Sequence, residues 1–304
     1  MTSDPFITIF TAPKPFRDPH IALIQRNAIR SWLAIGGEAE VFLVGDETGL
    51  AETAHELGVI HLPEVRCSPA GTPLVSSIFE TVRRRSRAAL LLYVNADILL
   101  RPDILAAGRA AHKQTRDFLL IGRRWDLLVA DQLDFSAGWP ERLAERAQKF
   151  GRLHPPAGSD YFLFPRSLFS ALPDFTIGRA GWDNWMIFHA LRQGWSVIDA
   201  TPDVMIVHQN HDYRHLGGRP HYDHPESQAN VRLARGESGE YTGYLLLDSD
   251  RELRDGRVER PRPTLARWLR RLEMGLRPAA ETGLRWELTR RIRRMRRRLT
   301  AEDS

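Results

Sequence analysis

The sequence predicts an α/β fold in which helices flank a sheet. Short apolar segments alternate with amphipathic ones over the first third of the chain, as in a parallel sheet whose strands are joined by helices. Residues 89–94 are apolar at every position, which is typical of a strand buried on both faces. With 304 residues and 42% apolar residues, the chain is long enough to bury a large core.

The first strand is expected at 6–10 and is followed by a helix. Asp18 and Pro19 mark the start of this helix, because aspartate is a favoured N-cap and proline a favoured first-turn residue. Further helices are expected from Thr72-Pro73 to Arg87, from Pro140 and from near Trp182. The other expected strands are 40–44, 59–62, 118–121, 161–164, 197–198 and 204–207.

Several protein classes are excluded by composition and motifs. The longest apolar run is far shorter than the ~20 residues of a membrane-spanning helix. The first residues lack the basic and apolar regions of a secretory signal, so a cytoplasmic location is expected. The single cysteine, Cys67, excludes an internal disulfide. No glycine-rich dinucleotide fingerprint, P-loop or nucleophile elbow follows any expected strand.

The positive charge of the chain is concentrated in its last segment, 261–304. Thirteen arginines and five acidic residues give this segment a net charge of +8, which leaves −3 for the rest of a chain whose total is +5. Two amphipathic helices are expected here, with apolar positions from Leu265 to Leu276 and from Leu284 to Leu299. Such a basic tail suits an anionic membrane surface, packing on the body or a second subunit, or, less well, nucleic acid.

Polar residues that follow strands are the first candidates for a binding site. In an open parallel sheet, ligands bind beyond the carboxyl ends of the strands. Thr11, Asp46, Asn95 and Asp97 follow the strands expected at 6–10, 40–44 and 89–94. A carboxylate at the end of a buried strand can hold a hard divalent cation, although Asn95-Ala96-Asp97 taken alone is more often a solvated turn.

At these residues the sequence resembles the nucleotide-sugar glycosyltransferases of GT-A fold. The resemblance covers about residues 5–215 and implies a Rossmann-like mixed sheet flanked by helices. It rests on segments that carry strand ends and acidic motifs: 7–14, 41–46, 91–97, 158–166, 181–185 and 207–211. Asn95 departs from the first aspartate of the family's Asp-x-Asp motif, so that an amide stands where a second charge is usual.

The resemblance implies a nucleoside-diphosphate sugar as donor and Mn²⁺ or Mg²⁺ as cofactor. Asp97 would ligate the metal, with His208 as the best candidate to complete its shell and His211 as the reserve. Thr11 and Asp46 would contact the nucleoside base. The implied donor-binding residues are Thr11, Ala12, Pro13, Lys14, Asp46, Asn95, Ala96 and Asp97.

The resemblance further implies a catalytic base for an inverting transfer. Asp183 is the first candidate and Asp160 the second, whereas an aspartate near a helix start also serves as an N-cap. Trp182 and Trp185 are candidates for stacking on a sugar ring, although tryptophans at a helix start are as often part of the core. The predicted acceptor-binding residues are Arg123, Arg124, Trp125, Trp182 and Trp185.

The resulting hypothesis is a metal-dependent glycosyltransferase that acts on a hydroxyl acceptor in polysaccharide or glycolipid synthesis. Residues 1–110 would bind the donor and 111–215 the acceptor, and 216–260 would be a flexible loop with a lid at Gly217-Gly218. The tail, 261–304, would bring the enzyme to a lipid-linked acceptor at the inner face of the membrane or form a homo-oligomer. The alternative is a non-catalytic protein that binds a polyanion or RNA through the tail, with affinity that falls steeply with salt.

Overall fold

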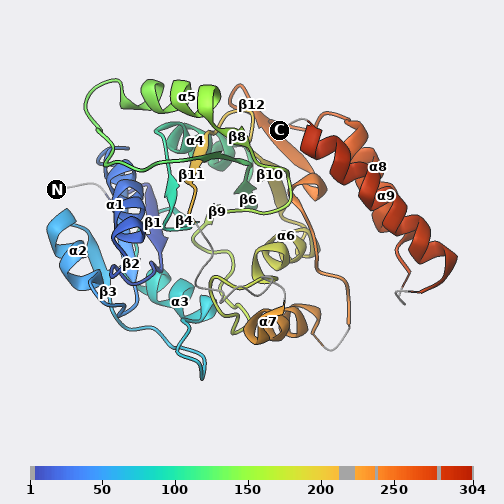
Figure 1. The fold of residues 1–304 in the computed structure, drawn as a ribbon, viewed down its shortest axis with the longest axis horizontal. Helices are drawn as coiled ribbons and strands as arrows, with labels where there is room; N and C mark the ends of the chain where they lie inside the picture. The colour runs from blue at the N-terminus through green and yellow to red at the C-terminus, as the bar shows by residue number, and fades with distance from the viewer. Residues whose placement is uncertain (1–3, 212–222, 237–238, 279–281, 303–304) are drawn as a thin grey trace.

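The computed structural model describes residues 4–211, 223–236, 239–278 and 282–302. A central sheet lies between helices on its two faces, and two long helices at the C-terminal end lie side by side at one end of the molecule (Figure 1). The helices are α1 (Pro19–Leu33), α2 (Leu50–Leu57), α3 (Val75–Arg85), α4 (Asp103–Gln114), α5 (Trp139–Phe150), α6 (Trp182–Arg192), α7 (Pro225–Arg235), α8 (Leu265–Leu276) and α9 (Gly283–Glu302).

The central sheet is mixed, as the resemblance implies. Its nine strands run in the order β13-β12-β10-β6-β9-β4-β1-β2-β3, and only β9 and β13 are antiparallel to their neighbours. The strands are β1 (Ile7–Thr11), β2 (Ala39–Val44), β3 (Ile60–Leu62), β4 (Leu90–Val94), β6 (Phe118–Ile121), β9 (Tyr161–Pro165), β10 (Ser196–Asp199), β12 (Arg251–Arg254) and β13 (Arg257–Glu259).

Apolar cores form on both faces of this sheet. β1 and β4 are neighbours inside this sheet and are buried at every residue, which explains the uninterrupted apolar sequence of β4 and the apolar residues Ile7, Ile9 and Phe10 of β1. On one face, α1, α2 and α4 supply Trp32, Leu50 and Ile104 to the core. On the other face, α3 and α6 supply residues such as Phe79 and Met186. The expected α/β architecture is therefore confirmed.

The start of α1 follows the sequence signal closely. The Asp18 carboxylate accepts hydrogen bonds from the backbone N–H groups of His20 and Ile21, at 2.9 and 3.0 Å. Pro19 occupies the first turn, where no intrahelical N–H partner is required. Toward the other end of α1, the Trp32 indole donates to the carbonyl of Ile98 at 2.9 Å, which fixes the helix against the segment that follows β4.

A second, smaller sheet covers one end of the first and was not predicted as a unit. Its order is β5-β11-β7-β8, with strands β5 (Ile98–Leu99), β11 (Ile206–Gln209), β7 (Arg124–Leu127) and β8 (Arg152–Leu153). Helix α5 packs on it through Trp139 and Leu143. β5 and β8 have two residues each, too short for a periodicity to reveal.

The region 216–260 differs from the expected loop. Its described part forms α7, the 3-10 helix η3 (Leu246–Asp248), and β12 and β13, which extend the central sheet. Alternating charged residues in 251–259 hide this strand pair from an analysis based on apolar runs. The lid predicted at Gly217-Gly218 falls outside the described residues. None of the helices in the described ranges has the length and apolar character needed to cross a bilayer.

Both tail helices form where they are expected, but they present charged side chains to the body. Arg267 and Arg270 of α8 are buried and bind Asp199 and Asp248 of the body, with closest N–O distances of 2.8 and 2.7 Å. The apolar residues Leu265, Trp268, Leu284, Leu288 and Met295 are exposed instead. Helix α8 therefore binds the body through charged side chains. The apolar positions of the two helices are divided, because Leu269 and Ile292 are buried whereas the five residues named above are exposed.

Candidate active site

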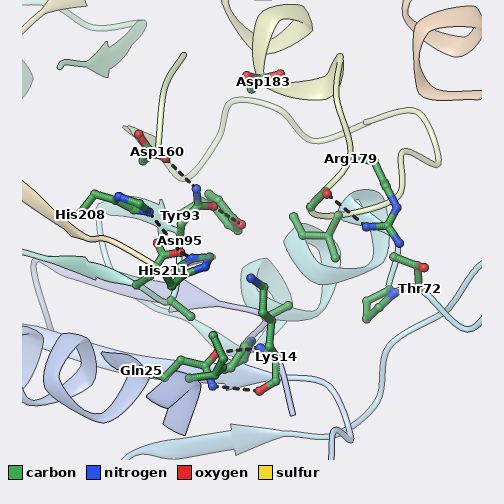
Figure 2. Close-up of a pocket in the computed structure, with 18 of the residues that line it drawn as sticks. Lys14, Gln25, Thr72, Tyr93, Asn95, Asp160, Arg179, Asp183, His208 and His211 are labelled. Carbon is green, nitrogen blue, oxygen red and sulfur yellow. Dashed lines mark hydrogen bonds and ion pairs between the residues drawn. The ribbon is translucent and has the colours of Figure 1, made fainter. Parts of the chain in front are cut away.

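A cleft of about 890 Å³ lies at the carboxyl ends of the central strands. The loop after β1 supplies Lys14 and the turn after β4 supplies Asn95, Ala96 and Asp97. The opposite wall comes from the start of α6, which carries Asp183 (Figure 2). This is the position that the topology of an open α/β sheet favours for a ligand.

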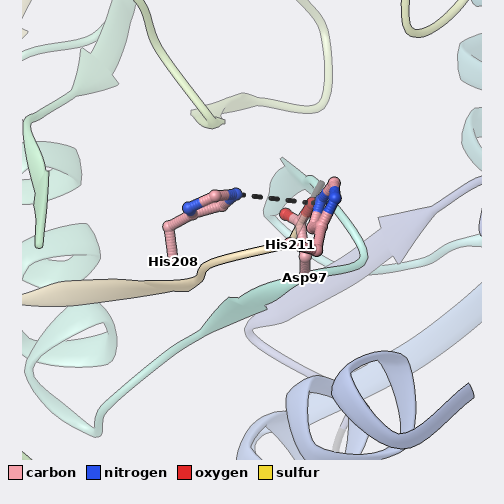
Figure 3. A group of neighbouring side chains, drawn as sticks. All are labelled: Asp97, His208 and His211. Carbon is pink, nitrogen blue, oxygen red and sulfur yellow. Dashed lines mark hydrogen bonds and ion pairs between the residues drawn. The ribbon is translucent and has the colours of Figure 1, made fainter. Parts of the chain in front are cut away.

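Three predicted metal ligands lie together in this cleft. The Asp97 Oδ2 atom lies 3.0 Å from the His211 Nε2 atom and 3.7 Å from the His208 Nε2 atom (Figure 3). One ligand atom from each of the three residues falls within 4.8 Å of the others. One carboxylate and two imidazoles at this spacing form a donor set for a divalent ion, so His211 is as well placed as His208.

The small sheet explains how these residues meet. His208 lies in β11, paired in register with Ile98 of β5 on one side and with Asp126 of β7 on the other. Because Asp97 directly precedes β5, it is brought next to His208, and its carbonyl accepts the Gln209 N–H at 3.1 Å. The sheet that sequence analysis missed is therefore what assembles the ligands that sequence analysis proposed.

The Asp97 carboxylate fits a bound cation. Its Oδ1 atom is buried and has no hydrogen-bond partner among the described residues, whereas a buried carboxylate oxygen ordinarily has one. Burial alone would raise the pKa of Asp97, but the hydrogen bond from His211 and the charge of His208 outweigh it, so the pKa lies below its ordinary value. The group is ionised at neutral pH, as metal ligation requires.

Asp126 orients His208 from behind. The His208 Nδ1 atom lies 3.2 Å from the Asp126 Oδ1 atom, while the Nε2 atom faces Asp97. The second Asp126 oxygen bonds the His154 Nδ1 atom at 2.7 Å. A carboxylate behind a ligating imidazole fixes the ring and strengthens it as a donor. Sequence analysis did not identify Asp126 or His154, because neither follows a predicted strand.

Asn95 holds Asp160 in place. The Asn95 amide nitrogen donates to the Asp160 Oδ1 atom at 3.0 Å, and its oxygen accepts the Tyr93 hydroxyl at 2.9 Å. The same Asp160 oxygen accepts a hydrogen bond from Arg124 at 2.6 Å. An amide at position 95 can make both contacts at once, which a carboxylate cannot.

Asp183 stands apart from this network, across the cleft. Gly181 is the N-cap of α6, so Asp183 lies inside the first turn and is not the cap. Burial raises the pKa of the Asp183 carboxyl above its ordinary value, backbone N–H groups at the helix start oppose the rise in part, and the negative charge of Asp160 adds to it. A carboxylate with a raised pKa is a stronger base than an exposed one.

Two cationic side chains extend the cleft beyond the metal ligands. The backbone of Lys14 is fixed by Gln25, which accepts its N–H at 2.7 Å and donates to its carbonyl at 3.0 Å. Arg179 binds Glu226 of α7 at 3.0 Å and lies beside Thr72 in Figure 2. Sequence analysis missed Arg179 and Gln25. The glycines around Arg179, at 178 and 181, are the only local signal for a turn there.

Five predicted site residues do not line the cleft. Thr11 is fully buried in β1, and Asp46 is exposed, whereas its neighbour Glu47 does line the cleft. Trp185 packs in the core and stacks on His189, so it is a core residue and does not face the acceptor. Arg123 and Trp125 also lie outside the cleft, with the Arg123 guanidinium bonded to the carbonyl of His154 at 2.6 Å. Ala12, Pro13, Arg124, Asp160 and Trp182 do line it.

No protein-family model matches the sequence, and no curated protein matches it. Solved structures with a similar fold include the mannosyltransferase PcManGT of Pyrobaculum calidifontis, in complex with GDP-Man and Mn²⁺. That chain is 17% identical with a TM-score of 0.42, and the match covers 70% of this chain and 59% of the mannosyltransferase. This chain thus spans less than two thirds of the length of that protein.

Two further solved structures are similar at the same level. Glucosyl-3-phosphoglycerate synthase of Mycobacterium tuberculosis is 15% identical with a TM-score of 0.46, over 75% of this chain and 77% of that one. A protein described as a putative nucleotide-diphospho-sugar transferase of Desulfovibrio desulfuricans G20 is 11% identical with a TM-score of 0.41. That match covers 75% of this chain and 96% of the other. All three are distant similarities in fold to proteins named as sugar transferases.

Proposed function

We propose that the protein is a glycosyltransferase that moves a sugar from a nucleoside-diphosphate donor to a hydroxyl acceptor. One observation carries the proposal: Asp97, His208 and His211 form a cation site on one wall of a cleft whose other wall bears the buried carboxylate of Asp183. A metal-dependent transfer with inversion needs these two elements on opposite sides of the sugar.

Asp97, His208 and His211 would hold Mn²⁺ or Mg²⁺. When bound, the cation supplies positive charge that offsets the negative diphosphate of the departing nucleotide. Lys14 and Arg179 add positive charge along the same cleft. Two imidazole ligands favour Mn²⁺ over Mg²⁺, because Mg²⁺ prefers oxygen ligands and keeps its waters.

Asp183 is the base that takes the proton of the acceptor hydroxyl. Its raised pKa brings it nearer to neutral pH, at which a carboxylate is a more effective base. Asp160 is a weaker candidate because one of its oxygens already accepts from both Arg124 and Asn95. We propose that Asp160 instead holds the side chains of Asn95 and Arg124 in place beside the metal site. We assign Trp182, which lines the cleft next to Asp183, to contact with the acceptor.

The proposal is tested by incubating the purified protein with UDP- and GDP-sugars and Mn²⁺ and measuring nucleoside-diphosphate release. We expect release that requires the metal and that falls by at least 100-fold in Asp97→Ala and in Asp183→Ala. Asp46→Ala is the matched control, since Asp46 follows a strand but lies outside the cleft, and it should keep wild-type turnover. Wild-type turnover in both cleft variants on every accepted donor would contradict the assigned roles.

The two site variants separate metal binding from base catalysis. Nucleoside diphosphate with Mn²⁺ should stabilise the wild type and Asp183→Ala alike, by about 2.7 kcal/mol at 100-fold excess over the dissociation constant. Asp97→Ala should lose this stabilisation. Equal stabilisation of Asp97→Ala would place the cation elsewhere.

We further propose that the tail lies on an anionic lipid surface at the cytoplasmic face of the membrane, near a lipid-linked acceptor. Exposed apolar residues of α8 and α9, such as Trp268 and Leu288, adjoin exposed arginines such as Arg291 and Arg294. This combination suits the boundary between anionic headgroups and acyl chains. RNA binding is less favoured, because Arg267, Arg270 and Arg296 are buried in ion pairs.

Sedimentation with phosphatidylglycerol vesicles tests the tail. We expect binding that weakens with salt, that is absent with phosphatidylcholine, and that falls at least fivefold in Leu288→Gln. Leu128→Gln, which changes a still more exposed leucine outside the tail, should bind as the wild type does. Absence of vesicle binding would overturn the lipid assignment. A dimer that Leu288→Gln dissociates would then assign the tail to a second subunit, and binding of RNA would assign it to nucleic acid.

A further inference from the structure

A second cavity, of about 480 Å³, lies between the tail and the body. Helices α8 and α9 form one side of it. The segment 155–157, the start of α6 and the end of α7 form the other side. Neither the metal ligands nor Asp183 line this cavity, so it is distinct from the cleft described above.

The charge around this cavity is strongly positive. Arg270, Arg293, Arg296 and Arg297 line it from the tail, and Glu273 is the only carboxylate among its described lining residues. Glu273 accepts from three of these arginines, with N–O distances of 3.2 Å to Arg270, 2.8 Å to Arg293 and 2.9 Å to Arg296. One negative charge is thus shared by three guanidinium groups.

A second carboxylate offsets part of this charge. Asp248 binds Arg270 from the body side at 2.7 Å. The four arginines of the tail are thus faced by two carboxylates, and Arg235 of α7 lines the cavity as well, so that guanidinium groups outnumber carboxylates among the described residues beside it. Arg270 and Arg296 are almost fully buried and are held by these carboxylates, whereas Arg293 is partly exposed and Arg297 is exposed.

One of these arginines has an unused donor. The Arg293 Nε atom binds Glu273, but its Nη2 atom is buried and has no hydrogen-bond partner among the residues the structure describes. Leaving a buried N–H without an acceptor costs free energy, more so on a charged group. Arg297, one turn further along α9, lines the same cavity with its side chain exposed.

We infer that this cavity binds the phosphate group of a small soluble ligand. A phosphate dianion would balance the excess charge and accept from several N–H groups at once, and guanidinium groups bind phosphate in a bidentate manner. The volume exceeds that of a phosphate ion and leaves room for an organic group attached to it.

The cavity adjoins the active-site wall. Segment 154–160 contributes His154, Gly158 and Asp160 to the cleft and 155–157 to the cavity, and the start of α6 contributes Asp183 to the cleft and Asn184 to the cavity. A ligand in the cavity therefore touches the same turns that hold Asp160 and Asp183. Binding itself does not depend on sugar transfer and is measured without a donor.

Isothermal titration with inorganic phosphate and with glycerol 3-phosphate, at constant ionic strength and without metal, tests the inference. We expect saturable binding that is weakened at least tenfold in Arg297→Gln. Arg294→Gln is the matched control: it makes the same charge change on an exposed arginine of α9 that does not line the cavity, and it should change the affinity less than twofold.

A cleft variant identifies where the phosphate binds. Lys14→Gln should retain wild-type affinity for phosphate, because Lys14 lines the cleft and not the cavity. Tighter binding of glycerol 3-phosphate than of inorganic phosphate would identify an organic phosphate as the ligand, and equal binding would identify the free anion. Absence of saturable binding, unchanged affinity in Arg297→Gln, or loss of affinity in Lys14→Gln would overturn the inference.

Discussion

Replacing Glu273 by glutamine should loosen the tail. Glu273 is almost fully buried on α8 and binds Arg270 on its own helix and Arg293 and Arg296 on α9. Glutamine has nearly the same shape, so the substitution removes the charge with little change in packing. Its amide group would also direct N–H donors toward guanidinium groups, which have no acceptor to offer.

The size of the effect follows from the number of contacts that are broken. Removing one partner of a buried ion pair costs about 3–5 kcal/mol, because the remaining charge stays buried without compensation. Here three guanidinium groups lose their shared carboxylate, while Asp248 still binds Arg270. We therefore expect the tail to be destabilised by about 3–5 kcal/mol, which is roughly two to four orders of magnitude in an opening equilibrium.

Hydrogen exchange of the α9 backbone amides measures this opening directly, because the broken contacts join α9 to α8. We expect exchange in α9 to accelerate by those two to four orders of magnitude, with little change in β1 or β4. Glu287→Gln is the control, since Glu287 is exposed on α9 and binds Arg290 at 3.3 Å, and its loss should cost no more than about 0.5 kcal/mol. Unchanged exchange in Glu273→Gln, or equal acceleration in both variants, would refute this account of the tail.

Three other predictions concern the body. Asp18→Ala should lower the free energy of unfolding by about 1 kcal/mol in urea titrations, because two N–H groups of α1 lose their acceptor; no loss would contradict the capping role. Burial raises the pKa of Asp103 to about 6, so its protonated form is favoured in the folded state, and folding stability should fall as pH rises from about 4 to about 6. Asp103→Asn should remove this loss of folding free energy, which amounts to at most about 3 kcal/mol. If stability falls with pH as steeply in Asp103→Asn as in the wild type, the raised pKa of Asp103 is refuted. Asp183 must be deprotonated to act as a base, and burial raises its pKa. The rate of sugar transfer should therefore still increase with pH at values above those at which an ordinary carboxyl group is ionised. A rate that is already maximal at the ordinary carboxyl pKa would contradict this role.

Much of the central sheet was predictable because its strands are rich in apolar residues, continuously so in β4 and β6. β1, β4 and β6 are buried at every residue, and helices such as α1 begin at recognisable caps. β12 and β13 were missed because charged residues alternate along an edge pair, so no apolar run marks them. Their neighbours in the sheet, and not their own sequence pattern, decide that they form strands.

The candidate site was predictable where chemistry follows a strand end directly. Asp97 and His208 could be identified in this way. Arg179 and His154 line the cleft, and Asp126 lies behind His208, through contacts between segments distant in the sequence. Strand-end position also misled at Thr11, whose side chain faces the interior, and at Asp46, which points to solvent. The sequence indicates where a strand ends, but it does not show to which side of the sheet the side chain of the last residue points.

The ionic attachment of α8 has a consequence for a shortened protein. Removal of the chain after Arg260 would uncover Asp199 and Asp248, which Arg267 and Arg270 otherwise bind, together with the polar surface around them. The uncovered surface would hold two carboxylates without their arginine partners, and beside them the apolar side chains of Val231, Ala234 and Leu245 that border the cavity next to the tail. A body expressed without the tail should therefore be less stable than the full chain.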